Sequence, residues 1–300
     1  MGQHMKLYFY KTTMAFIALC LTAMVSHATS ATLDTDVDLS IPKALAMGIK
    51  HQSYDYASIE DGVEKMAMDY TQVKVPLGKF DVMDQILVPS ISLERTAFRF
   101  QNTAASDQTL YTLKSKFMFI EKQDEKWTRI LQVTPSFHSD TDAMDEEAFS
   151  LMGLAIWRFQ STDNSAWTMG FGANHLFGEY KPIPLLSYQY QVTDGLQLDV
   201  GFPVTKAEYR WQSNWTGFAS FAPAGGNWRV DTQNNDEINV AYSSWLASTG
   251  VRYQFKPKMW ATLALTQSVG RKFNLDDSDS SQEVDVDNSG AIMFSIGFHP

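Results

Sequence analysis

Histidine and serine are the residue types in this chain that could support nucleophilic catalysis, and few of them are suitably placed. Outside the first 31 residues the internal histidines are His51, His138 and His175, and Ser136 lies two positions before His138. A serine nucleophile needs a histidine base held in a defined arrangement. The chain has no G-x-S-x-G elbow, no H-E-x-x-H pair and no glycine loop that could cradle a phosphate. We therefore expect rim or lumen histidines without a catalytic role, no enzyme activity and no cofactor.

An acidic stretch near the end of the chain could bind a divalent cation. It runs from Asp276 to Asp287, and its last part begins like a calcium-binding EF-hand loop at Asp285. Such a loop needs a glutamate at its twelfth position, which here is Ile296. The sequence thus predicts a solvated external loop and no defined metal site, and leaves loose contacts with divalent ions open.

Charged residues recur on the polar side of segments whose other side is apolar. A charge that faces lipid at mid-depth costs ~2–4 kcal/mol, so in a membrane barrel these side chains should point into the lumen. They could hold a plugged interior together through salt bridges, or line a hydrated pore and contribute to its selectivity. We favour the pore, because larger barrels leave room for water. The lumen-lining candidates are Lys114, Lys116, Arg158, Asp199, Lys206, Glu208, Arg210 and Arg252.

The elements that would position these charges are strands, because apolar and polar residues alternate along most of the chain. Tyr111 to Phe119 and Leu196 to Phe202 are clear examples, with one apolar and one polar face each. We predict fourteen strands, with twelve as the alternative, because 66–79 and 87–102 alternate poorly and 206–211 is short. The predicted ranges are 44–57, 66–79, 87–102, 109–122, 128–139, 147–162, 165–178, 182–192, 196–203, 206–211, 215–222, 239–255, 259–272 and 289–298.

Short and long connections alternate along the chain. Tight polar turns are predicted at 123–126, 162–164, 193–195, 212–214 and 256–258, and longer connections at 140–147, 224–237 and 274–289. This asymmetry is typical of a membrane barrel with short turns on the periplasmic side and long loops outside. Tryptophans lie beside most tight turns, as in an aromatic girdle at the membrane interface. They are Trp127, Trp167, Trp215 and Trp260.

The beginning of the chain resembles a secretory address. Lys6 and Lys11 precede an apolar run from Thr13 to Val25, and small residues follow at 28–31. The run is too short for a membrane-spanning helix, which needs ~20 residues. We expect a signal peptide at 1–31, a periplasmic lead at 32–43 and a barrel at 44–298. Cys20 is read as part of the apolar run, because Leu19 before it does not suit a lipoprotein anchor.

Composition excludes several partners. Residues 1–31 hold two lysines and no acids, so the chain without them has 22 basic and 34 acidic residues and a net charge of −12. This charge argues against a nucleic-acid partner. Cys20 is the only cysteine, so disulfides and thiolate metal sites are excluded once the signal peptide is removed.

The last strand carries the sharpest motif. Ile292, Phe294, Ile296 and Phe298 lie on one face, with Met293, Ser295 and Gly297 between them. This pattern resembles the terminal signal by which the barrel-assembly machinery recognises outer-membrane proteins, although His299 and Pro300 follow the final aromatic. The last strand must pair with the first, because unpaired backbone groups are intolerable in lipid.

Part of the chain resembles a bacterial family of outer-membrane barrels with no assigned function. The resemblance rests on the motifs at 187–190, 201–203 and 224–228, within Ser187 to Val230. It implies an all-β, antiparallel, up-and-down barrel in the outer membrane, with lipid and lipopolysaccharide as its surroundings. We expect a passive or gated channel for a small polar solute that the sequence does not identify. The alternative is a non-conducting structural or surface barrel that acts through its external loops.

Phe298→Asp should impair assembly and leave periplasmic aggregates, because it removes the terminal aromatic and places a charge near lipid. Removal of His299 and Pro300 alone should change little. The measurement is the fraction of folded protein that migrates faster on gels when it is not heated. A normal yield of the folded Phe298→Asp form would contradict this interpretation of the last strand.

Overall fold

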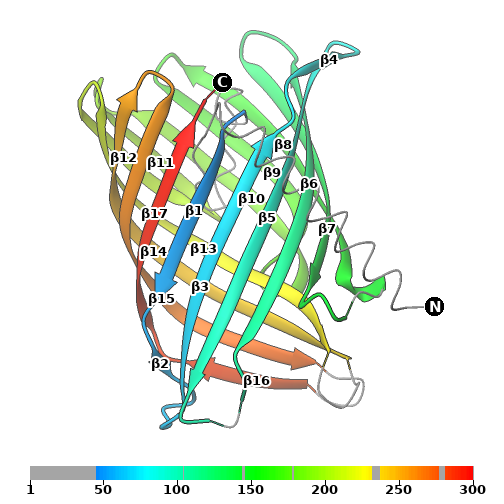
Figure 1. The fold of residues 1–300 in the computed structure, drawn as a ribbon. Coiled ribbons are helices and arrows are strands. Elements are labelled where there is room, and N and C mark those ends of the chain that lie inside the picture. Colours follow the sequence, from blue (N-terminus) through cyan, green and yellow to red (C-terminus); the bar gives the residue numbers. More distant parts are fainter. Residues whose placement is uncertain are drawn as a thin grey trace.

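The computed structural model describes residues 45–299, apart from 104, 144–145, 178, 232–236 and 277–280, and shows one closed antiparallel wall (Figure 1). Fourteen strands form the wall, so the predicted number is confirmed and the alternative of twelve is wrong. The signal peptide and the lead lie outside the described residues. The wall strands are β1 (Met47–Tyr54), β3 (Lys65–Pro76), β5 (Gln85–Gln101), β6 (Gln108–Lys122), β7 (Trp127–Ser139), β8 (Phe149–Thr162), β9 (Ser165–Phe177), β10 (Glu179–Gln191), β11 (Leu196–Phe202), β12 (Thr205–Gln212), β13 (Trp215–Asp231), β14 (Glu237–Lys256), β15 (Met259–Asp276) and β17 (Ser289–Phe298).

The first and last wall strands close the barrel. β1 pairs with β17 from Met47 opposite Phe298 to Tyr54 opposite Ala291. Three further strands, β2 (Ala57–Ser58), β4 (Phe80–Val82) and β16 (Ser281–Val286), lie in the connections, and a 3-10 turn (Glu146–Ala148) follows β7. β1 begins and β17 ends at the same end of the barrel, which is the upper end in Figure 1. By the asymmetry of the connections we call this the periplasmic end and the other the outer end.

The alternation in sequence becomes an inside and an outside. In β17, Ile292 and Phe294 are 60% and 50% exposed, whereas Met293 and Ser295, which alternate with them, are buried. The same division holds around the wall, where large apolar side chains cover the outer surface. Within the described residues, no helix is long and apolar enough to cross a bilayer. An apolar outer surface on a closed wall is the pattern of a barrel that crosses the membrane with its strands.

Three of the four predicted girdle tryptophans lie on the outer surface beside tight turns. Trp167 contacts Tyr188 with ring centroids 4.7 Å apart, and Trp215 contacts Tyr253 at 4.5 Å. Trp127 contacts a phenylalanine of β8 in the same way. Trp260 was placed wrongly: it is buried on the inner face and packs against His299. It is the second residue of β15, in which the side chains of even-numbered residues such as Thr262 and Ala264 point inward.

The connection predicted at 224–237 is largely strand. β13 continues through the glycines to Asp231 and pairs with β14 along its whole length. A side chain at Gly226 would lie 2.5 Å from the Trp228 ring, so glycine is required there by packing rather than by a turn. Likewise β15 extends to Asp276 and pairs with β16 inside the connection predicted at 274–289.

The outer half of β13 leaves the wall and crosses the lumen. β12 pairs with it only from Trp215 to Phe221, and beyond that point its free side lies against β9 and β7. At its end Arg229 pairs in parallel with Ser139 of β7. The outer end of the barrel is therefore narrower than the periplasmic end, because β8 to β12 do not contribute to this last ring.

Two apolar clusters fill parts of the interior. The outer cluster joins strands on both sides of the crossing, and the second lies against β5 to β8 and β10. The buried members of the outer cluster are Tyr54, Ala57, Met66, Met68, Phe98, Leu110, Trp228, Val230, Tyr242, Leu246, Phe273, Val286 and Ala291. Those of the second are Val88, Met118, Ile120, Ile130, Ile156 and Leu185.

Gly170→Ala should impair folding, because a Cβ at this position would lie 2.3 Å from the backbone oxygen of Ala155. Gly153→Ala in the neighbouring strand is the matched control, since its nearest contact would be 3.9 Å away. The fraction of folded, heat-modifiable protein should fall strongly in the first variant and stay near wild type in the second. Equal yields of the two variants would contradict the close approach of β8 and β9.

Candidate functional site

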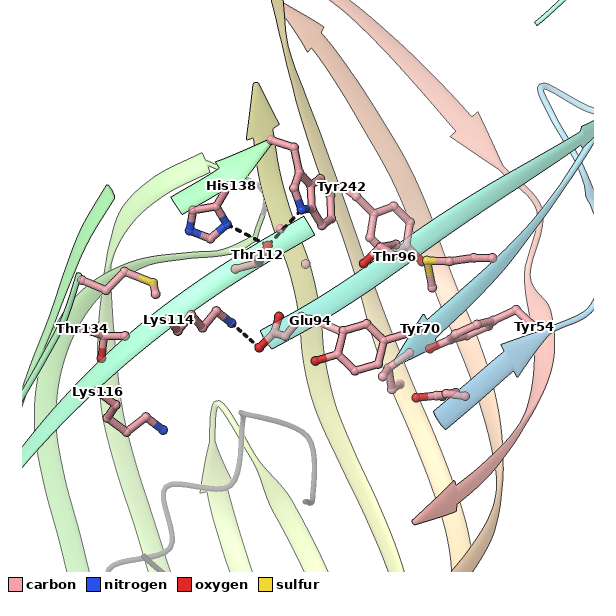
Figure 2. Close-up of a pocket in the computed structure, with 18 of the residues that line it drawn as sticks. Tyr54, Tyr70, Glu94, Thr96, Thr112, Lys114, Lys116, Thr134, His138 and Tyr242 are labelled. Atoms are coloured by element: carbon pink, nitrogen blue, oxygen red, sulfur yellow. Dashed lines mark hydrogen bonds and ion pairs between the residues drawn. The ribbon is translucent and has the colours of Figure 1, made fainter. Parts of the chain in front are cut away.

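An internal cavity of about 170 Å³ lies beneath the outer apolar cluster. Its walls come from β1, β3, β5, β6, β7 and β8 on one side and from β13 and β14 on the other. Figure 2 shows Tyr54, Tyr70, Glu94, Lys114 and His138 converging on this space from different strands. The cavity exists because β13 crosses the lumen instead of following the wall.

The side of the cavity toward the outer end is apolar. Phe98 makes edge contacts with Trp228, Tyr242 and Phe273, with ring centroids 6.2, 6.4 and 5.3 Å apart. Rings in such packing exclude water and form a continuous layer. We call the buried outer cluster, centred on Phe98 and Trp228, the seal.

One cation is enclosed in the seal. Arg271 is 1% exposed, lies over the Tyr54 ring and donates from Nε to the hydroxyl of Tyr242 at 3.3 Å. Its Nη1 donates to the backbone oxygen of Asp287 at 3.2 Å. A buried charge is costly unless it is held by hydrogen bonds, so these contacts fix the side chain and the layer around it.

The opposite side of the cavity is polar. Glu94 accepts from the Lys114 Nζ at 2.9 Å and from the Gln72 amide at 3.0 Å, and these side chains are largely buried. Lys116 lines the same wall two residues along β6. The cavity is therefore amphipathic, with rings and thioethers on one side and ionised or hydrogen-bonding groups on the other.

His138 belongs to a buried polar network rather than to a catalytic triad. Its Nε2 lies 2.8 Å from the Ser136 hydroxyl and 3.2 Å from that of Ser150, and its Nδ1 lies 3.2 Å from the Thr112 hydroxyl. Thr112 also accepts the indole N–H of Trp228 at 3.0 Å. A hydroxyl stands where a triad would have a carboxylate. The network's evident work is to hold Trp228, and so the seal, in place.

The eight predicted lumen residues share the inward parity, but the fold brings only Lys114 and Lys116 to the cavity. Lys206 and Arg252 both lie 3.3 Å from Glu208, and Arg158 donates to Gln189 at 2.6 Å. The strand register places Asp199 opposite Lys206. Arg210 lies near the β12–β13 turn and is exposed. Their function in conduction stays a prediction.

The sequence missed the cavity residues Gln72, Glu94 and Thr96. They lie in the two segments whose alternation was poorest, where Met66 to Met68 and Ala97 to Phe98 are buried on consecutive positions. The partnership of Glu94 with Lys114 could have identified this site. It becomes visible only when the pairing of β5 with β6 is known. Trp228 was missed because its segment was read as a loop.

The other candidates lie apart from the cavity. His51 is exposed on the outer surface, 2.9 Å from the Thr71 hydroxyl, and the side chain of His175 lies outside the described residues. In the acidic stretch, Glu283 and Asp285 contact Lys272 at 2.5 and 3.5 Å, which raises the pKa of that lysine. Residues 277–280 are not described. Among the described residues, no group of three histidines or acids could hold a metal ion.

A family model described as "Domain of unknown function (DUF6268)" matches residues 34–299, so the chain belongs to that family. A search of curated proteins found no match.

Several solved structures are similar in form. The toluene transporter TodX of Pseudomonas putida is 10% identical, with a TM-score of 0.45, over 84% of this chain and 89% of that one. An outer-membrane channel from Pseudomonas putida F1 is 12% identical, with a TM-score of 0.47, over 89% and 100%. The KdgM porin, in complex with disordered oligogalacturonate, is 5% identical, with a TM-score of 0.39, over 85% and 99%. The barrel assignment rests on the strand pairing of the chain itself.

Lys114→Met should destabilise the barrel by about 3 kcal/mol, because it leaves the buried Glu94 without its cation. Lys114→Met with Glu94→Gln should recover most of this loss, since the remaining amide carries no charge. Lys272→Met, which breaks an exposed pair, is the control and should leave the urea midpoint of unfolding unchanged. A single variant at Lys114 as stable as wild type would show that the pair does not hold the cavity wall.

Proposed function

We propose that this member of the DUF6268 family is a gated channel of the bacterial outer membrane, exported by the signal peptide at 1–31. Its solute is small and carries polar groups, and the cavity holds it during passage. The observation that supports this proposal best is the crossing strand, which closes a polar cavity on the outer side with an apolar layer. The outer half of β13 is the gate.

A gate must be able to move without breaking the wall. The outer half of β13 pairs with β14 on one side, whereas its other side has lost β12. It carries Trp228 and Val230, two members of the seal. If this half-strand moved away from β7 and β9 while it kept its ladder with β14, the seal would open and no pairing with β12 would be lost, because none exists beyond Phe221.

The end of the gate is latched to β7 by a few polar contacts. The Asp231 backbone N–H donates to the Asp140 carboxylate at 3.0 Å, and the Asp140 N–H donates to the Arg229 oxygen at 3.3 Å. Arg229 also lies 3.1 Å from the Glu147 carboxylate, which is 60% exposed. The Glu147 carboxylate is exposed, so its ion pair with Arg229 contributes little, whereas the Asp231–Asp140 hydrogen bond is partly buried.

Below the cavity the inward face suits a polar solute. Lys206, Glu208 and Arg252 form a linked set of ion pairs, and Arg158 adds another cation. Charged groups that line a hydrated path select ions and orient dipolar solutes. We assign these residues to the periplasmic half of the path.

A disulfide between Ser139→Cys and Arg229→Cys should lock the gate. The two residues are direct partners in the β7–β13 bridge, where the separation of the Cα atoms suits a disulfide. Cys20 is changed to serine in this background. In planar bilayers the oxidised variant should show no openings, and reductant should restore them. Glu147→Ala should raise the open probability of the unlocked barrel.

The control is Ser220→Cys with Ser248→Cys, which links β13 to its permanent neighbour β14. Oxidation of this pair should leave the openings unchanged. Equal conductance of the oxidised and reduced Ser139–Arg229 variants would contradict the gate. If neither the wild type nor Glu147→Ala ever opens, the non-conducting surface barrel is the better proposal, and the closed outer end is the observation that favours it.

A further inference from the structure

The barrel wall is interrupted beside the gate, at a depth where it should face lipid. β11 and β12 are short, so β10 from Glu179 to Leu185 and β13 beyond Phe221 have no β11 or β12 partner. Among the described residues, the residue-by-residue registers pair β10 with β9 and β11. We call the space between the β10 edge at 179–185 and the β13 edge at 222–226 the seam.

The seam begins within the membrane. From Leu196, next to a tight turn, to Phe202 at the tip of the hairpin, the strand rises about 15 Å at ~3.3 Å per residue and a tilt of ~40°. The apolar band of such barrels is about 25 Å tall. Leu186, Val200 and Phe221 near the tip are exposed apolar side chains on the outer surface. The tip therefore ends in hydrocarbon, well below the outer interface.

The β10 edge has fewer backbone donors than an ordinary strand edge. Gln191 donates its backbone N–H toward β9, to the oxygen of Asn164, whereas Val192 donates toward β11, to that of Leu196. N–H groups alternate in direction along a strand, so those of even-numbered residues of β10 point to the β11 side. In the unpaired stretch two of these even positions are Pro182 and Pro184, which have no N–H.

The β13 edge lacks one donor in the same way. The Arg229 oxygen and the Asp231 N–H both point away from β14, toward Asp140. No register shift separates them from Pro223, so position 223 faces the same way and also lacks a donor. At the hairpin tip, the Thr205 hydroxyl accepts the Gly201 N–H at 3.1 Å and lies 3.0 Å from the Gly201 oxygen. Prolines at both edges and the capped tip reduce the number of backbone donors at these edges, whereas the carbonyl oxygens remain.

The seam adjoins the cavity. Ala224, Gly225 and Gly226 line the cavity and belong to the stretch of β13 that has no β12 partner. Pro223 is fully buried, so the seam is closed in this structure, with β13 lying against β9. On this side the cavity is lined by a stretch of β13 that pairs with β14 and has no β12 partner.

From these observations we propose that the seam is a lateral passage between the cavity and the bilayer, used by a small amphipathic compound of about one ring. The size follows from the cavity of about 170 Å³, since a dry cavity of about 150 Å³ accommodates benzene. The amphipathic character follows from the rings of the seal on one side and Glu94, Lys114 and Thr112 on the other. This inference rests on the proposed channel and names its solute class and one of its openings.

The test uses one cysteine in the cavity, Thr134→Cys, in the Cys20→Ser background, with Thr96→Cys as a second site on another wall. The barrel in liposomes is treated with N-phenylmaleimide, which partitions into the bilayer, or with its membrane-impermeant 4-sulfophenyl analogue. The cavity cysteine should react with the first reagent and at least tenfold more slowly with the second. Val200→Cys on the lipid face measures the supply of reagent from the bilayer.

A variant with a lengthened β11–β12 hairpin closes the seam. Two residues are added to each arm between Phe202 and Thr205, in the alternation of the wall. Labelling of the cavity cysteine by N-phenylmaleimide should fall at least tenfold, and that of Val200→Cys should not change. Undiminished labelling in the lengthened variant, or none from the bilayer in the original, would overturn the lateral passage. Openings in the separate gate experiment would still support the channel, so the two failures are distinguishable.

Discussion

In a bilayer, every backbone N–H and C=O that faces hydrocarbon must find a partner within the protein, because lipid offers none. The closure of β1 onto β17 satisfies this requirement for the ends of the sheet. It also fixes the number of strands and turns all hairpins the same way. Where the wall is interrupted, Pro182, Pro184 and Pro223 lower the number of donors, and the Thr205 hydroxyl pairs with Gly201.

The same constraint produces the interior. Once alternate side chains face lipid, the remaining ones must fill a space too wide for a simple core. Here the chain fills it unevenly: the crossing half of β13 brings apolar rings together at the outer end and leaves a polar cavity beneath them. Trp228 joins both parts, since its ring packs on Phe98 and its N–H donates to Thr112. Seal and cavity are therefore mechanically coupled.

The functional classes separate on this geometry. A wide water-filled pore would need a lumen that is polar at both ends, and a hydrolase of the Ser-His-Asp type would need a carboxylate behind its histidine. The outer end is apolar, and His138 is oriented by the Thr112 hydroxyl. A closed channel with a bound-solute cavity is consistent with both observations.

The sequence by itself determined the barrel, its fourteen strands and the inward side of each well-alternating strand, because lipid on one face imposes a period of two that any reader can count. It placed Lys114, Lys206 and Arg252 on that face. It could not show that Glu94 meets Lys114, because pairing between strands depends on register. Nor could it show the crossing of β13, since Gly225 and Gly226 read locally as a turn. Only the tertiary structure decided that these glycines and Pro223 lie in a strand that leaves the wall, because the reason is packing around Trp228 and the loss of β12, neither of which is local in sequence.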